Sequence, residues 1–112
     1  MSEEDADSGA ETVPFLEIIV LEESTFPIGN LMATPRAIAA MDTAGQSIAE
    51  FLGRHVRGDF GELDAEDTMS NNRAIEVGCR ILSAYSMVDG TKLWIITEAD
   101  RSATTLLLPD EY

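Results

Sequence analysis

The dipeptide Asp89-Gly90 constrains the fold of this chain more than any other feature of its sequence. It separates two runs of apolar and β-branched residues, 81–88 and 92–97. Asp-Gly between two such runs is a strong signal for a β-hairpin with a type I′ turn. The sequence therefore predicts an antiparallel pair of strands near the C-terminus.

A second turn, at residues 100–102, leads from the run 92–97 into a third apolar run at 103–108. Pro109 ends this run, because a proline cannot donate to a ladder of strand hydrogen bonds. The run 92–97 is apolar on both faces, as expected for a central strand with helices on at least one side. These features predict a three-stranded antiparallel meander.

Three helices are expected before the meander, at residues 34–45, 47–58 and 64–78. Each range opens on a Thr, Ser or Asp that can cap a helix and closes on a glycine. Residues 31–33 predict a short strand before the first helix. The fold class is therefore α+β, with about three helices packed on a three- to four-stranded antiparallel sheet.

The N-terminal residues differ in composition from the rest. Residues 1–12 hold five acidic residues and no basic one, so we expect a disordered acidic tail. Residues 13–21 are mostly apolar and predict a strand, which Pro14 restricts to a sheet edge or a strand start. An exposed apolar edge there would favour a homodimer formed by strand addition. Residues 13–112 are expected to form a single domain.

Acidic residues outnumber basic ones by 21 to 7, a net charge of -14. This balance disfavours direct binding to nucleic acid or to an anionic membrane, since phosphates require Lys and Arg. No apolar run approaches the roughly 20 residues of a membrane span, and the acidic N-terminus does not resemble a targeting peptide. The single cysteine, Cys79, excludes an internal disulfide. We expect a cytoplasmic protein without a cofactor.

His55 is the only histidine and the weak catalytic candidate, with Asp59 as the carboxylate that would orient it. The favoured alternative places His55 in the last turn of the second helix, donating to free carbonyls. The carboxylates within residues 59–67 have ligand chemistry for a divalent cation but lack EF-hand spacing. Asp64 is expected to cap the third helix, and Glu66 and Asp67 are expected to lie at the positive end of its dipole. These roles explain the carboxylates, so no metal site is predicted.

Asn72 falls on the expected apolar face of the third helix, together with Met69 and Cys79. A polar side chain there must find partners or cost about 1–3 kcal/mol. Asn72 therefore either ties the preceding loop to the helix, which is favoured, or contacts a ligand. Cys79 is expected in the core, and Trp94 and Tyr85 are expected as packed cross-strand neighbours.

Glu98, Asp100, Arg101 and Ser102 lie in the turn between the last two predicted strands. Asp and Ser commonly close turns through their own backbone, and Arg101 is expected to pair with Glu98 or Asp100. Turn chemistry is the favoured interpretation. The alternative is a binding surface at this end of the meander.

From residue 26 onward, several stretches match a known pattern: Phe-Pro-Ile-Gly (26–29), Ala-Thr-Pro (33–35), Arg-His-Val-Arg-Gly-Asp-Phe-Gly (54–61), Glu-Asp (66–67), Asn72, Leu-Ser-Ala-Tyr (82–85) and Trp-Ile-Ile-Thr-Glu-Ala-Asp-Arg-Ser-Ala-Thr-Thr-Leu-Leu-Leu-Pro-Asp-Glu-Tyr (94–112). The chain resembles a largely uncharacterised family of small bacterial proteins carried on plasmids and integrative elements. Phe60 stands where a tryptophan would be expected, which removes an indole N–H. The resemblance implies an accessory role in genetic conflict or element maintenance.

The leading hypothesis is a non-enzymatic protein that binds a partner with a basic surface. Its sharpest form is an anti-restriction or anti-CRISPR inhibitor that uses DNA-like negative charge. The first alternative is a small hydrolase or metal-dependent enzyme that uses His55 and the carboxylates of 59–67. The second is a small-molecule-binding regulator, with a pocket beside Asn72 and Trp94.

Overall fold

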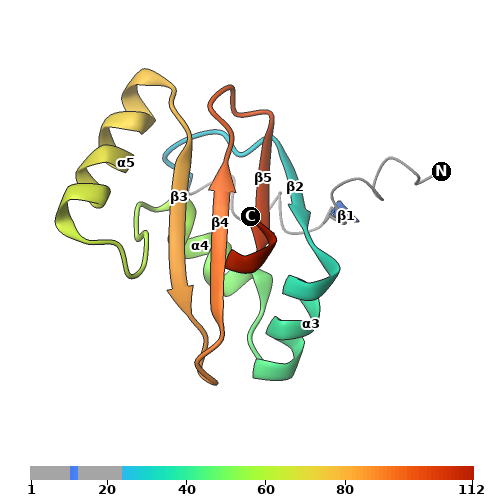
Figure 1. The fold of residues 1–112 in the computed structure, drawn as a ribbon. Helices are drawn as coiled ribbons and strands as arrows, with labels where there is room; N and C mark the ends of the chain where they lie inside the picture. The colour runs from blue at the N-terminus through green and yellow to red at the C-terminus, as the bar shows by residue number, and fades with distance from the viewer. Residues whose placement is uncertain (1–10, 13–23) are drawn as a thin grey trace.

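The predicted C-terminal meander is present. β3 (Ile81–Ser86), β4 (Lys92–Thr97) and β5 (Ala103–Leu107) are consecutive neighbours in the sheet and pair antiparallel (Figure 1). The structure, a computed structural model, describes residues 11–12 and 24–112. It confirms the α+β class, with helices and a sheet in one architecture.

The turn of the β3–β4 hairpin differs from the prediction. Gly90 donates its N–H to the carbonyl of Met87 at 2.9 Å, and Met87 donates to the carbonyl of Thr91 at 2.8 Å. Gly90 has a φ of 91°, whereas Asp89 does not have a positive φ. A type I′ turn needs positive φ at both central residues. The loop is instead the three-residue kind, in which a type I turn is followed by one left-handed glycine.

The sheet is mixed, not wholly antiparallel as predicted. β2 (Asn30–Ala33) pairs parallel with β5, so that Ala33 lies opposite Leu106. The chain between these strands contains the three α-helices of the described residues, and such a long crossover lets two strands run in the same direction. β1 (Glu11–Thr12) pairs antiparallel with β2, and the strand order is β1-β2-β5-β4-β3.

Two N-terminal predictions fall largely outside the described residues. Glu11 and Thr12 belong to the segment predicted as a disordered tail, and they form the short edge strand β1. The rest of that tail and the strand predicted at 13–21 lie outside the residues that the structure describes.

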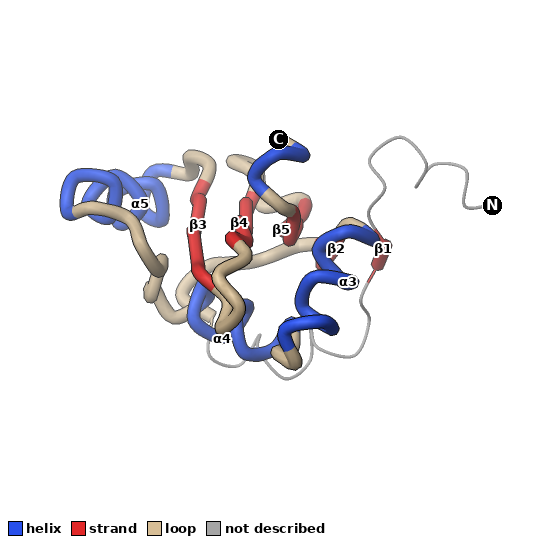
Figure 2. Tube along the Cα trace, turned by 60° about the horizontal axis from the view of Figure 1, so that its bottom comes forward, coloured by secondary structure: helices blue, strands red, loops and turns tan. Residues whose placement is uncertain are grey.

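α3 (Pro35–Ala44) and α4 (Ile48–Val56) start where the capping residues predict. Thr34 and Ser47 accept hydrogen bonds from backbone N–H groups in the first turns, and Gly45 ends α3 in a left-handed conformation. α4 ends within two residues of the predicted glycine. Figure 2 shows α4 on one side of the sheet and η1 (Pro109–Glu111) on the other.

The core lies between α4 and the sheet. α4 contributes Phe51, Leu52 and Val56, each with 1% or less of its surface exposed. Successive residues of a strand point to opposite faces, so every second strand residue faces α4. The strand residues buried on this face are Leu31, Ala33, Ile81, Ser83, Tyr85, Leu93, Ile95, Thr97, Thr104 and Leu106.

α5 (Ala65–Val77) begins and ends as predicted, but its buried face is one position away from the expected one. Asn71 and Ala74 are buried, whereas Asn72 is exposed. Met69 is 67% exposed and Cys79 is also exposed, so their predicted core positions are wrong. α5 lies beside the edge strand β3 rather than across the sheet (Figure 1), and a helix in that place needs only a narrow buried stripe.

Side-chain and backbone groups cover the outer edge of β3. The Asn71 amide donates to the carbonyl of Leu82 at 2.6 Å, and Asn71 Oδ1 accepts from the N–H of Leu82 at 3.3 Å. Further along, Ala84 donates to the carbonyl of Phe60 at 3.1 Å and accepts from the N–H of Glu62 at 2.7 Å. Unpaired edge groups invite pairing with other chains, so α5 and the loop before it close this edge.

Replacement of Asn71 by Ala is expected to lower the free energy of unfolding by about 1–3 kcal/mol, because both backbone groups of Leu82 lose their partner. Asn72→Ala is the matched control, since it makes the same change in helix propensity at an exposed position. Asn72→Ala is expected to change the free energy of unfolding by less than about 0.5 kcal/mol. Urea unfolding of the two variants, followed by circular dichroism, measures the difference. Equal losses of stability would contradict the assignment of Asn71 as the edge partner.

Candidate functional site

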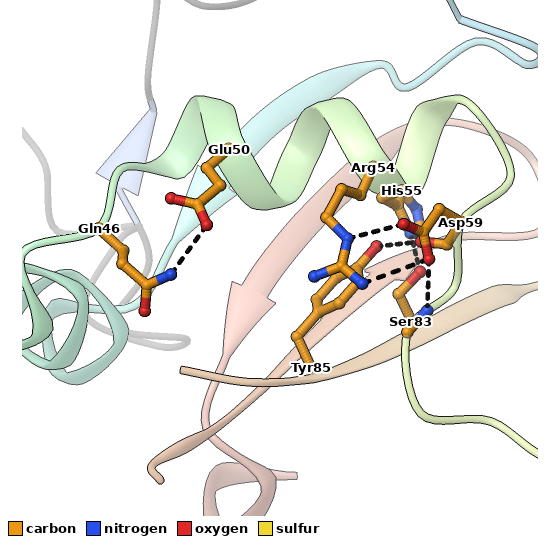
Figure 3. Close-up of polar contacts among 8 residues, drawn as sticks. Gln46, Glu50, Arg54, His55, Asp59, Ser83 and Tyr85 are labelled. Carbon is orange, nitrogen blue, oxygen red and sulfur yellow. Dashed lines mark hydrogen bonds and ion pairs between the residues drawn. The ribbon is translucent and has the colours of Figure 1, made fainter. Parts of the chain in front are cut away.

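The only histidine of the chain lies in the core. His55 has none of its surface exposed, and the last turn of α4 directs its ring toward β3 and β4 (Figure 3). Its Nδ1 lies 2.6 Å from Ser83 Oγ, and its Nε2 lies 2.9 Å from Thr97 Oγ1. The prediction that His55 donates to free helix carbonyls is wrong, because two small hydroxyl residues of the sheet satisfy both ring nitrogens.

The hydrogen bonds around His55 have only one consistent direction. Thr104 Oγ1 donates its proton to the carbonyl of Ile28 at 2.8 Å, since a carbonyl can only accept. Thr97 must then donate to Thr104 Oγ1, which lies 2.7 Å away, and must accept from the Nε2–H of His55. These contacts place a proton on Nε2. Burial keeps the imidazole neutral, so Nδ1 carries no proton and accepts from the Ser83 hydroxyl. We call these four side chains and the Ile28 carbonyl the His55 network.

Aromatic rings complete the surroundings of His55. The Phe26 ring meets the imidazole edge-on at 5.3 Å between centroids, and the Phe60 ring lies 6.3 Å away. Burial lowers the pKa of His55 to about 3, because charging the ring in this apolar enclosure is costly. The imidazole is therefore neutral near neutral pH.

Asp59, proposed above as the partner of His55, instead pairs with Arg54. Arg54 Nε lies 2.8 Å from Asp59 Oδ2, and the N–H of Gly61 donates to Asp59 Oδ1 at 3.2 Å (Figure 3). The hydrogen bond from Arg54 lowers the pKa of Asp59. Tyr85 donates its hydroxyl to the backbone carbonyl of Asp59 at 2.7 Å. The catalytic pairing of His55 with Asp59 is therefore wrong.

A serine hydroxyl that donates to an imidazole has the form of a nucleophile and its base. Ser83, His55 and Thr97 nevertheless have 0% of their surface exposed, so no substrate in solvent reaches them in this conformation. What the arrangement does is tie α4 to three strands and to the segment that precedes β2.

Three of the five carboxylates within residues 59–67, Asp59, Glu62 and Asp64, have separate structural partners. Asp64 Oδ1 accepts from the N–H of Asp67 at 2.8 Å and caps α5, as predicted. Glu62 pairs with Lys92 at 3.1 Å. Within residues 11–12 and 24–112, no group of three or more histidines, cysteines or carboxylates is placed to hold a metal ion. No helix in these ranges combines the length and apolar character needed to cross a membrane.

Arg101 binds backbone carbonyls, not the carboxylates of Glu98 or Asp100 as predicted. Its guanidinium donates to the carbonyl of Ala74 at 2.8 Å and to that of Glu98 at 3.0 Å. Carbonyls at the C-terminal end of a helix carry partial negative charge, which attracts a cation. Asp100 accepts from the N–H of Ser102 at 2.9 Å, so the prediction of turn chemistry is confirmed for that pair.

Trp94 and Tyr85 are not cross-strand neighbours as predicted. Trp94 lies opposite Ala84, and Tyr85 lies opposite Leu93. Adjacent register positions face opposite sides of the sheet, so Tyr85 points into the core and Trp94 to the other side. There Trp94 packs against the ring of Tyr112, with 5.6 Å between centroids.

The predicted binding residues do not form one site. Arg101 reaches the end of α5, Trp94 lies under the C-terminus, and Asn72 is exposed on α5. Three cavities are lined by other residues, so the pocket predicted beside Asn72 and Trp94 is not among them. The α3–α4 groove, with a volume of about 410 Å³, is lined by Pro35, Ile38, Ala39, Met41, Asp42, Gln46 and Ile48.

Sequence reasoning missed both hydrogen-bond partners of His55. A signal for them exists: Ser83, Thr97 and Thr104 interrupt otherwise apolar strands with hydroxyls. Those hydroxyls need a buried polar partner, and the only histidine is a suitable one. Which strand positions face it, however, depends on the register.

The stability of the protein is expected to fall as the pH drops below 6.5, the ordinary histidine value. In the unfolded chain His55 takes up a proton below pH 6.5, whereas in the folded protein its pKa is about 3 and the ring stays neutral. The loss approaches about 1.4 kcal/mol per pH unit, and above pH 6.5 this group has no effect. Urea unfolding between pH 7 and pH 5 measures it, in a window where the carboxylates remain largely ionised.

Nitrogen-15 NMR of the single histidine ring checks the same state directly. The Nε2–H tautomer is expected to persist from neutral pH until the protein unfolds in acid. A ring that takes up a proton near pH 6.5 while the fold stays intact would contradict the His55 network.

No protein-family model matches the sequence, and comparisons with curated proteins and with solved structures give no match.

Proposed function

We propose that the chain is a non-enzymatic module that binds a protein partner with a basic surface. The supporting observation is the excess of exposed carboxylates. In the described part of the chain, nine of them are exposed and form no ion pair: Asp42, Glu50, Asp64, Glu66, Asp67, Glu76, Asp89, Glu98 and Asp100. Such a surface attracts basic partners over a distance of about one Debye length.

The charge is unevenly distributed along the sequence. Residues 1–23 hold eight of the 21 acidic residues and none of the seven basic ones, so residues 24–112 carry thirteen acidic residues against seven basic. The N-terminal segment thus supplies more than half of the net charge of -14. In this proposal it accelerates encounter with the partner, and the folded surface provides specificity.

The setting we propose is an accessory role in a bacterial mobile element, as the sequence resemblance implies. An anti-restriction or anti-CRISPR inhibitor is its sharpest form, because the nucleic-acid-binding surfaces of defence proteins are basic. The DNA-like negative charge that this form requires depends strongly on residues 1–23.

A small hydrolase that uses His55 has less support. The imidazole is enclosed between Phe26, Phe60 and the sheet, and both of its nitrogens are engaged. Asp59 is held by Arg54 at the surface. A metal-dependent version would need Asp59, Glu62 and Asp64 to leave their present partners.

Affinity capture from a bacterial lysate tests the proposal, with the full chain as bait at low and at high salt. The expected result is one stoichiometric partner with a basic surface that high salt releases. Capture of nothing specific, or of a partner that salt does not release, would contradict charge-driven docking.

Charge-neutralised variants then test the role of the N-terminal segment with the captured partner. Neutralising Glu3, Glu4, Asp5 and Asp7 as amides is expected to slow association by about tenfold at low salt and to have little effect at high salt. The matched control neutralises four acids of the folded part: Glu66, Asp67, Glu76 and Glu98. Stopped-flow mixing measures both rates, and an equal or greater effect of the control would reject a steering role for residues 1–23.

A further inference from the structure

The α3–α4 groove presents an apolar surface from two consecutive helices. Pro35 and Ala39 are exposed, and Ile38 and Ile48 are only partly buried. The volume of about 410 Å³ lies within the roughly 300–1,000 Å³ range of ligand pockets, so the groove has room for side chains of another molecule. Accessible apolar side chains gathered around a hollow are typical of a binding surface.

An uncompensated negative charge lies on the wall of this groove. Asp42 is exposed, and its carboxylate has neither a hydrogen bond nor an ion pair among the described residues. Arg36, the one basic residue of α3, is engaged by Asp110 at 3.0 Å. Arg36 is therefore already paired, and Asp42 stays available for a cation from another molecule.

The polar end of the groove is held in place. Gln46 donates through Nε2 to Glu50 at 2.8 Å (Figure 3), and its Oε1 accepts from the N–H of Val88 at 2.8 Å. Both ends of the Gln46 amide are thus engaged, and the Glu50 carboxylate is kept beside it. A pre-organised wall reduces the entropy lost when a ligand binds.

We infer that the α3–α4 groove binds a short segment of the protein partner in which an apolar side chain lies near a Lys or Arg. The apolar residue would fill the groove, and the cation would meet Asp42. This inference rests on the proposed function, and it names the surface and the chemistry that the partner would present.

Charge favours a segment of another protein over the apolar residues 13–21 of this chain. That stretch contains Glu17, is followed by Glu22 and Glu23, and has no Lys or Arg. Its carboxylates would face Asp42 and Glu50 as like charges, which is unfavourable. A basic segment has the complementary sign.

A phage-displayed library of random peptides of about 12 residues is the probe, selected on the full-length protein. Enriched peptides are expected to combine apolar residues with Lys or Arg. A synthetic copy of the best one is then labelled, and fluorescence anisotropy gives its Kd for the native protein and for three variants.

Ala39→Arg fills the groove from an exposed position and is expected to raise Kd by about tenfold or more. Asp42→Asn is expected to raise Kd several-fold and to weaken its dependence on salt. Asn72→Arg adds the same charge as Ala39→Arg on an exposed position of α5, away from the groove, and is expected to change Kd by less than about twofold. Thermal unfolding confirms that the variants are folded.

Three results would overturn the inference: no peptide enriched above background, a Kd that Ala39→Arg leaves unchanged, or enriched peptides without Lys or Arg. Displacement of the labelled peptide by a synthetic peptide of residues 13–23 would assign the groove to the chain's own segment. If a salt-sensitive partner is captured equally well by Ala39→Arg, the proposed function stands and only the groove is rejected. If neither a peptide nor a partner binds, both are rejected.

Discussion

The His55 network is the interaction on which the rest of the structure depends. A buried imidazole or hydroxyl without a partner costs about 1–3 kcal/mol, and the network leaves none of its polar groups unpaired. In doing so it connects α4 with β3, β4 and β5, and it reaches the carbonyl of Ile28 just before β2. Elements far apart in the sequence can therefore meet in only one relative arrangement.

The sequence stretches on which the proposed plasmid-borne family is based coincide with this network. The stretches that carry the resemblance contain Phe26, His55, Ser83, Thr97 and Thr104, all of which belong to the network or pack against it. The groove and the unpaired carboxylates that support a binding function lie on the surface, where residues can change without disturbing the core.

A protein whose polar core is closed must work through its surface in this conformation. Here the surface differs from place to place: the edge of β3 is covered by Asn71 and a loop, the C-terminus packs over Trp94, and the α3–α4 groove stays open. An edge strand closed against pairing disfavours aggregation, whereas the groove keeps accessible apolar side chains beside the carboxylate of Asp42.

The sequence by itself determined the features that depend on neighbouring residues. Thr34, Ser47 and Asp64 cap helices because a side-chain oxygen reaches N–H groups only two or three residues away, and Asp89-Gly90 marks a hairpin for an equally local reason. The tertiary structure decided the parallel pairing of β2 with β5, the burial of Asn71 in place of Asn72, and the partners of His55. Each of these features depends on which distant segment lies opposite. A shift of one residue in helix face or strand register would bury different side chains, and local sequence does not show such a shift.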